Sequence, residues 1–188
     1  MSQPITDRMR WTIADLELLP EDDRRYEIID GELLVTRAPH WKHQKSINRV
    51  ANALDDWSVE THLGEAVPTP GVIFSDADNV IPDVVWISNE RLATGLDQAG
   101  QLIVAPELVV EVLSSGAENV RRDRELKLRL YSARGVREYW IIDWQAQQME
   151  VYRRESAALA LVATLFPGDE ITSAMLPGFR MPIAVLFT

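Results

Sequence analysis

The sequence of 188 residues contains no cysteine. This absence excludes disulfide bonds, a thiolate metal site and a cysteine nucleophile. The sequence also lacks any apolar run that approaches the ~20 residues of a membrane-spanning helix. Its first residues, Met1 to Pro4, lack the apolar core of a signal peptide. We therefore expect a cytoplasmic protein with no membrane segment.

Basic residues are scarce relative to acidic ones. The chain has 19 Lys and Arg against 29 Asp and Glu, a net charge of -10. Non-specific binding to nucleic acid depends on Lys and Arg that neutralise phosphates, so this balance argues against it. Two interpretations remain open for the one basic cluster: a solvated helix face, or a local phosphate-facing patch on an acidic body. The cluster consists of Arg121, Arg122, Arg124, Lys127, Arg129, Arg134 and Arg137.

The length suits one domain, and the apolar periodicity predicts a mixed α/β fold with a central mixed sheet flanked by helices. We expect a single domain over 1–188, with a core at about 11–153 and further strands over 154–188. An Asp30-Gly31 turn is typical of a β-hairpin. Strands are predicted over 26–29, 32–36, 80–87, 108–113, 138–143 and 149–153, extended chain over 64–74, and helices over 11–19, 41–59 and 118–133.

One predicted strand carries an unexpected carboxylate. Glu111 is flanked by Val109, Val110, Val112 and Leu113, and such a near-continuous apolar run is typical of a strand buried on both faces. A carboxylate rarely lies there unless a cation, a metal or a hydrogen-bond network holds it. The sequence therefore marks Glu111 as a candidate functional residue.

Two more acids and one cation belong to the same pattern. Asp83 lies within another apolar run, and Lys127 lies downstream in the predicted helix, with Asp123 near it on the helix surface. Leu126, Leu130 and Ala133 form the apolar stripe of that helix. Glu27 is a third acid among strand residues, with an exposed strand position as the alternative.

These residue types suit metal-assisted chemistry on a phosphate. Two carboxylates on neighbouring strands that face one cleft would repel each other, and Mg²⁺ binds to one or two carboxylates while leaving room for water and phosphate oxygens. Such a metal can activate a water and neutralise charge on the phosphate. A nearby Lys can orient or deprotonate the water, or stabilise the transition state. The alternatives are that Asp83 is a turn residue after Pro82 and that Glu111 and Lys127 form a buried ion pair without catalysis.

Two histidines lie three residues apart at the start of the predicted second helix, His40 and His43. Only His62 remains as a further histidine, so the ligand set of a structural zinc site is missing. We favour His43 as a polar residue near an active cleft.

At these positions the chain resembles a known family. Ile81-Pro82-Asp83, followed by a strand with Glu111, resembles the PD-(D/E)xK nuclease superfamily. The blocks 26–33, 109–114, 127–131 and 135–140 resemble, in this order, the Uma-type restriction endonuclease family. Where the superfamily motif has its Lys, this chain has Leu113, and Lys127 on a helix stands where the Uma-type variant places its cation.

The resemblance implies a restriction-endonuclease-like fold and Mg²⁺- or Mn²⁺-dependent hydrolysis of DNA phosphodiester bonds. Asp83 and Glu111 would hold the metal, joined by the Val112 carbonyl, while Lys127 would assist the water. Glu27 would be an additional catalytic residue, as an extra ligand or a hydrogen-bond partner. A homodimer is possible. The alternative is a catalytically silent nuclease fold that binds nucleic acid or a protein; the intact acid pair favours the enzyme, whereas Leu113 and the net charge favour the alternative.

Overall fold

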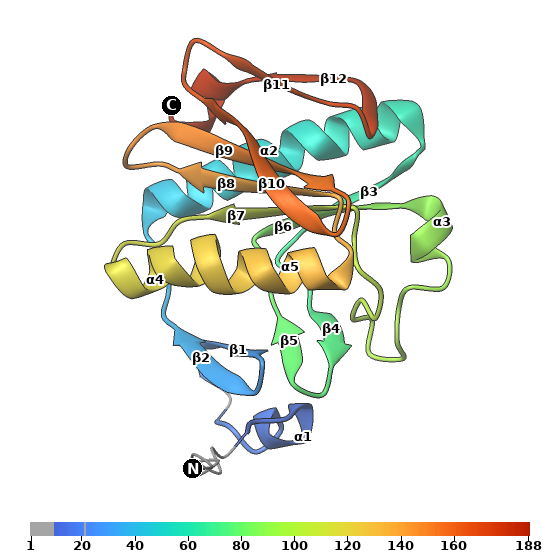
Figure 1. Cartoon of the computed structure of the whole chain (residues 1–188), viewed down its shortest axis with the longest axis vertical. Coiled ribbons are helices and arrows are strands. Elements are labelled where there is room, and N and C mark those ends of the chain that lie inside the picture. Colours follow the sequence, from blue (N-terminus) through green and yellow to red (C-terminus); the bar gives the residue numbers. More distant parts are fainter. Residues whose placement is uncertain (1–9, 21) are drawn as a thin grey trace, which may run out of the picture.

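A computed structural model describes residues 10–20 and 22–188 and has a mixed α/β fold around a six-stranded sheet (Figure 1). The strand order is β10-β9-β8-β7-β6-β3. Strands β7 and β8 run parallel, and the other neighbouring pairs are antiparallel. The predicted mixed sheet is therefore confirmed. Its strands are β3 (Gly64–Pro68), β6 (Val84–Ser88), β7 (Leu108–Val112), β8 (Glu138–Asp143), β9 (Gln148–Glu155) and β10 (Ala158–Leu165).

Helices cover both faces of this sheet (Figure 1). In β7, Val110 and Val112 pack on the side of the long helix α2, whereas Val109, and Leu113 just after the strand, pack on the opposite side. This alternation follows from the period of two of a strand, and burial of both faces explains the continuous apolar run in the sequence. The helical segments are α2 (Trp41–Thr61) on one face, and α4 (Ala117–Arg121), a π-helical turn η1 (Arg122–Lys127) and α5 (Leu128–Arg134) on the other.

A second, four-stranded sheet lies below the α4–α5 segment in Figure 1. Its order is β2-β1-β5-β4. The turn between β1 and β2 has φ of 50° at Asp30 and 72° at Gly31, so both residues are left-handed and the predicted hairpin is present. The strands are β1 (Arg25–Ile29), β2 (Glu32–Thr36), β4 (Val72–Ser75) and β5 (Asp78–Val80).

The C-terminal segment completes the core on the α2 side. Phe179 and Met181 are buried in the same apolar cluster as Leu54 of α2 and Trp140 of β8. In the described part of the chain, no helix is long and apolar enough to cross a membrane. The remaining elements are α1 (Ile13–Leu16), α3 (Asn89–Leu92), the hairpin of β11 (Glu170–Ser173) and β12 (Leu176–Pro182), and a 3-10 turn η2 (Ile183–Leu186).

The predicted strand over 80–87 is wrong in extent. It is divided between β5, which ends at Val80, and β6, which begins at Val84. Pro82 lies between them and has no backbone N–H for a strand ladder, which explains the break. Asp83 therefore precedes β6 instead of lying within it. Because Val84 pairs with Val110 in antiparallel register, Asp83 stands at the strand end opposite Glu111.

The predicted apolar stripe of the 118–133 helix is also partly wrong. Leu130 is buried, but Leu126 is only half-buried and Ala133 is exposed. The least exposed positions that precede Leu130 in this segment are instead Asp123 and Lys127, with 0% and 1% exposure. The π-helical turn carries both residues, and π turns are frequent at functional sites. Two charged side chains thus face the sheet where an apolar stripe was predicted.

Asp78 links the small sheet to α5, and its loss should destabilise the fold. Although burial raises the pKa of Asp78, hydrogen bonds from the Asp30 N–H, Arg134 and Ser75 lower it below its ordinary value. A carboxyl group whose pKa is lower in the folded than in the unfolded protein stabilises the fold at pH values above its unfolded-state pKa. This stabilisation disappears as the pH falls through its folded-state pKa. Asp78→Asn should cost about 1–3 kcal/mol near pH 7.

Urea unfolding of wild type and variant measures this cost. The difference should be smaller at an acidic pH, below the ordinary Asp pKa of about 3.9, because protonation of the folded-state carboxylate removes the stabilisation. Asp76→Asn is the matched control, since Asp76 is exposed in the same turn and should change stability little at either pH. A deficit in Asp78→Asn that is equal at both pH values would contradict the assignment to the ionised carboxylate.

Candidate active site

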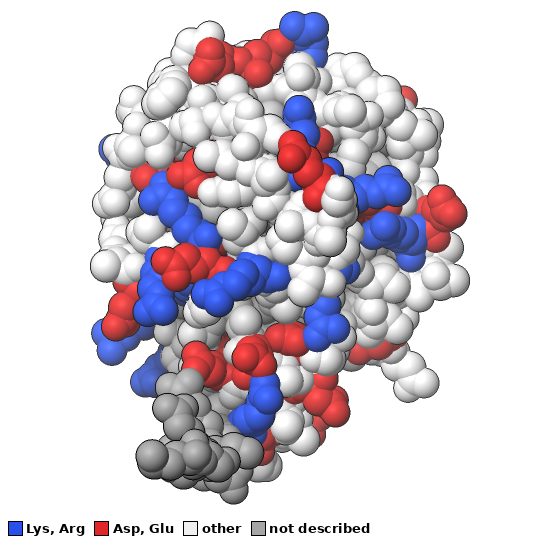
Figure 2. Space-filling view, viewed as in Figure 1, with Lys and Arg blue, Asp and Glu red and all other residues white. Residues whose placement is uncertain are grey.

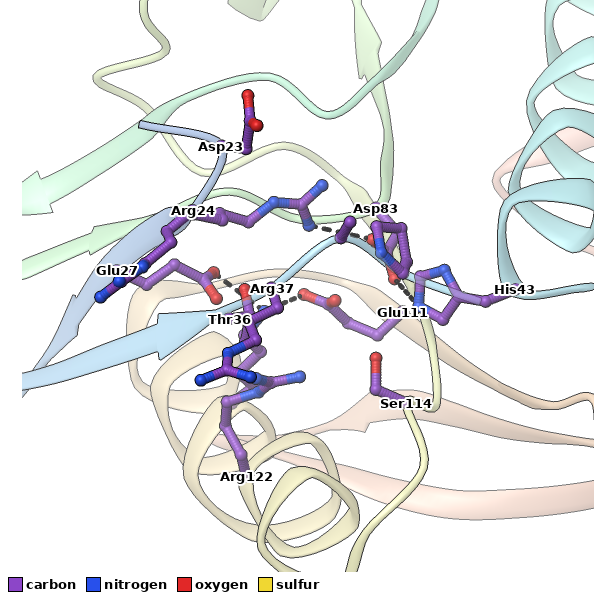
Figure 3. A pocket seen from close by; sticks show the side chains of 14 residues that line it. Asp23, Arg24, Glu27, Thr36, Arg37, His43, Asp83, Glu111, Ser114 and Arg122 are labelled. Carbon is purple, nitrogen blue, oxygen red and sulfur yellow. Dashed lines mark hydrogen bonds and ion pairs between the residues drawn. The ribbon is translucent and has the colours of Figure 1, made fainter. Parts of the chain in front are cut away.

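A cavity of about 190 Å³ lies between the β1–β2 hairpin, the end of β7 and the first turn of α2. Glu27, Asp83, Glu111 and Lys127 all line it. Figure 3 shows the three carboxylates pointing into the same space, with His43 approaching from α2. The structure thus brings together the four side chains that the sequence singled out, from four separate segments of the chain.

Lys127 is held between two buried carboxylates. Its Nζ lies 2.9 Å from Glu111 Oε1 and 3.0 Å from Glu27 Oε1. The Tyr131 hydroxyl donates to the same Glu111 oxygen at 2.8 Å, and the Ile81 N–H donates to Glu27 at 2.9 Å. Glu27 is 1% exposed, so an exposed strand position is wrong for it. The cation and both acids form one buried, hydrogen-bonded cluster.

Asp83 is fixed to the backbone beside Glu111. The Val112 N–H donates to Asp83 Oδ2 at 2.9 Å, and Arg25 donates to Oδ1 at 3.1 Å. His43 Nε2 lies 3.5 Å from Oδ2. Asp83 does stand at a strand start, as the turn interpretation required, but its buried carboxylate reaches across to β7. It therefore faces the same cavity as Glu111.

The cavity carries more carboxylate than its lysine can balance. Burial raises the pKa of Glu111, Lys127 opposes this rise, and the neighbouring acids add to it, bringing the pKa to about 8. These neighbouring acids are Asp83, Asp123 and Glu27. Burial alone would lower the pKa of Lys127, but Glu111 and Glu27 raise it above its ordinary value. Lys127 consequently stays protonated at neutral pH.

Asp123 has a different partner from the one expected. Arg122 donates to both of its oxygens, from Nε at 2.9 Å and from Nη2 at 3.2 Å. The second carboxylate on Lys127 is therefore Glu27, from another sheet, instead of its helical neighbour Asp123. Arg122 itself lines the cavity (Figure 3). No sequence pattern indicated this pair, because its orientation depends on the π-helical turn.

The basic cluster of the 121–137 segment is largely paired with acids. Arg124 contacts Asp143 and Glu150, and Arg134 contacts Asp78. On the face shown in Figure 2, basic and acidic side chains are interspersed. Neither a fully solvated helix face nor a continuous phosphate-facing patch describes the cluster. The cations near the cavity come instead from several segments.

The two histidines near the start of α2 have separate surroundings. His43 is 4% exposed and lines the cavity, and its Nδ1 has no hydrogen-bond partner in the described structure. Burial lowers the pKa of His43, and this effect outweighs the opposing effect of Asp83. His40 is exposed and stacks on Trp144. Both imidazoles border the cavity next to this one, but only His43 also lines the carboxylate cavity.

The donor set of the cavity suits a hard divalent cation. Asp83 and Glu111 provide carboxylate oxygens. Among the buried residues that line the cavity, three acids, Glu27, Asp83 and Glu111, face two cations, Arg122 and Lys127, and this balance favours an added cation. Among the described residues, no three His, Asp or Glu side chains are grouped as a metal site. The protein would thus supply two carboxylates. Mg²⁺ is usually bound by one or two carboxylates and keeps water molecules as its other ligands. Arg25, which now pairs with Asp83, is partly exposed and would have to share that carboxylate.

Comparison with known proteins agrees with this fold. A crystal structure of "a putative nuclease belonging to DUF820" from Anabaena variabilis ATCC 29413 superposes with a TM-score of 0.74 at 19% sequence identity. The similarity covers 94% of this chain and 97% of that chain. No curated protein matches the sequence. Residues 13–184 match the Uma2 family, described as "Putative restriction endonuclease", and the chain belongs to that family.

Proposed function

We propose that the chain hydrolyses DNA phosphodiester bonds with Mg²⁺ or Mn²⁺ held by Asp83, Glu111 and the Val112 carbonyl. The observation that carries this proposal is the placement of Asp83 and Glu111 at adjacent strand ends on one cavity, with Lys127 2.9 Å from Glu111. When bound, the cation would supply the positive charge that activates a water and neutralises the phosphate.

Lys127 contributes charge and orientation in this proposal. Because Glu111 and Glu27 raise the pKa of Lys127, we assign it the role of a cation and not that of the base that takes a proton from water. Its ammonium fixes the Glu111 and Glu27 carboxylates and adds positive charge at a buried position, where electrostatic effects are strong. Tyr131 helps to hold Glu111 in the same orientation.

Arginines at the cavity supply contacts for the phosphates of the substrate. Arg24, Arg25 and Arg37 line it on the side of the β1–β2 hairpin. Arg37 is exposed, and within the described residues it has no carboxylate partner. A guanidinium of this kind binds phosphate with two parallel hydrogen bonds. Local positive charge is therefore available despite the net charge of -10.

The second candidate function is a non-enzymatic module that binds nucleic acid or protein. The observation that favours it is the complete pairing of Lys127, which is 1% exposed and resembles a structural ion pair. Leu113 also occupies the position at which the superfamily motif carries its Lys.

Incubation with supercoiled plasmid in Mg²⁺, Mn²⁺ or EDTA tests the two candidates. We expect nicking or linearisation that requires the metal. The double variant Asp83→Asn/Glu111→Gln, purified in the same way, should be inactive and thereby exclude a contaminating nuclease. Failure to cut plasmid, linear or single-stranded DNA in either metal would overturn the nuclease proposal in favour of the binding module.

Asp83→Asn should weaken metal binding. We expect Mn²⁺ affinity, measured by calorimetry, to fall at least about tenfold, because even the outer contacts of a metal site are typically worth that much. Glu65→Gln, an exposed acid on β3, is the control and should retain wild-type affinity. Equal affinities in wild type and Asp83→Asn would remove Asp83 from the ligand set.

A further inference from the structure

A second cavity of about 370 Å³ lies directly beside the carboxylate cavity. The two share walls formed by residues 36–39, His43 and Ser114. A ligand bound at the carboxylates could therefore extend into the second cavity without leaving the protein. The kind of group that binds in the second cavity therefore determines which form of substrate can reach the carboxylates.

Its outer wall is a pair of stacked rings. His40 and Trp144 are 4.7 Å apart between centroids and only 9° from parallel. The indole N–H of Trp144 donates to the Leu113 carbonyl at 3.0 Å, which fixes the ring to the end of β7. His40 is exposed, so the stack ends in an accessible ring that borders the cavity. Such a platform suits another flat aromatic ring.

Positive charge accompanies the stack. Arg37 is one of the residues that line both cavities. Lys42 Nζ lies 6.0 Å from the centre of the Trp144 ring. Sites for unpaired nucleic acid combine cations that contact the backbone with rings on which bases stack. Stacking also supplies affinity that does not depend on many phosphate contacts, which suits a chain with a net charge of -10.

We infer that the second cavity binds an unpaired nucleobase of single-stranded DNA, stacked on His40 and Trp144, while Arg37 contacts the phosphate that enters the carboxylate cavity. This inference rests on the proposed function and specifies its substrate: DNA that is single-stranded, or locally unpaired, at the cleavage point. A base within an intact duplex is stacked on its neighbours and cannot occupy the cavity without leaving the helix.

Two substitutions of His40 separate the ring from its other role. His40 is also the N-cap of α2, where its Nδ1 accepts from the Lys42 N–H at 3.1 Å. His40→Asn keeps a favoured N-cap and removes the ring. His40→Phe keeps a ring and removes the cap. A merely structural role of His40 would make the Phe variant the weaker one, whereas base stacking makes the Asn variant the weaker one.

Fluorescence anisotropy with a short labelled oligothymidine, in EDTA to prevent cutting, provides the measurement. Wild type should bind this strand more tightly than a duplex of equal length. His40→Asn should lose about tenfold in affinity, as expected for one stacked base, and His40→Phe should stay close to wild type. An abasic strand should bind to wild type as weakly as oligothymidine binds to His40→Asn. A plot of the logarithm of the binding constant against the logarithm of the salt concentration should be less steep for Arg37→Gln, by about 0.7, which is the contribution of one phosphate contact on a single strand.

The outcomes distinguish this inference from the nuclease proposal. If oligothymidine binding depends on the ring but no metal supports cutting, the base site stands and the nuclease proposal fails. If DNA is cut, but wild type binds duplex as tightly as oligothymidine and His40→Asn binds both like wild type, the base site is overturned and the nuclease proposal stands. Equal binding of the abasic strand and oligothymidine to wild type would also overturn the base site.

Discussion

Replacing Lys127 by Met is expected to lower the rate of metal-dependent DNA cleavage by about 10²–10³, the usual loss for one well-placed electrostatic group. The ammonium lies 2.9 Å from Glu111 and 3.0 Å from Glu27, so its removal takes away both positive charge and the orientation of the two acids. Met keeps most of the buried volume. Initial rates of plasmid nicking, with Mn²⁺ above saturation, measure the effect.

The same substitution should reduce stability, and the two effects need separate measurements. Lys127 is 1% exposed, and breaking a buried ion pair by removing one partner typically costs about 3–5 kcal/mol. Rates should therefore be compared at a temperature where circular dichroism shows both proteins folded. In the double variant Glu27→Gln/Lys127→Met, removal of one carboxylate should recover part of the stability and none of the rate.

Lys127→Arg is the control for charge alone. The guanidinium is larger, planar and differently branched, and a fully buried site leaves little room for it. We expect low activity in spite of the retained positive charge. A folded Lys127→Met protein that cuts at the wild-type rate would show that Lys127 is a structural ion-pair partner only.

The sequence predicted the local elements well where one physical signal dominated. The apolar run around Glu111 indicated β7 because a strand covered on both faces needs apolar side chains at every position. The Asp30-Gly31 pair indicated a hairpin because both residues tolerate positive φ. The long helix α2 was predicted to within a turn, since Ile47, Val50 and Leu54 follow the helical period.

What the sequence could not predict depends on contacts between distant segments. Glu27 lies between Tyr26 and Ile28, a position that the local sequence does not distinguish from an exposed strand position. Only the approach of Lys127, 100 positions later in the chain, makes it a buried ion-pair partner. The π-helical turn changes which residues of the 122–127 segment face the sheet, and periodicity arguments assume a regular α-helix. Asp123 was therefore misplaced on the helix surface.

The candidate site falls between these cases. A carboxylate in an apolar strand was sufficient to single out Glu111, and the same reasoning reached Asp83, although the latter lies just outside β6. The second cavity had no comparable signal. His40 and Trp144 are adjacent only because the start of α2 lies beside the chain that leaves β8.

Glu111→Gln and Glu27→Gln should separate the two acids that share Lys127. Glu111 stands opposite Asp83 at the end of β7, whereas Glu27 accepts from the Ile81 N–H at 2.9 Å and belongs to the other sheet. We therefore expect Glu111 to hold the cation and Glu27 to position Lys127. Glu111→Gln should lower both Mn²⁺ affinity and the cleavage rate, the rate by about 10²–10³.

Glu27→Gln should retain Mn²⁺ affinity within a few-fold, because its amide oxygen still accepts from Ile81 and the cation ligands are unchanged. Its cleavage rate should fall less than that of Glu111→Gln, since Lys127 keeps one of its two carboxylates. Calorimetry and plasmid nicking on the same protein samples give both quantities. Equal losses of Mn²⁺ affinity in the two variants would make Glu27 a third ligand, and Lys127 would then be held by metal-binding residues on both sides.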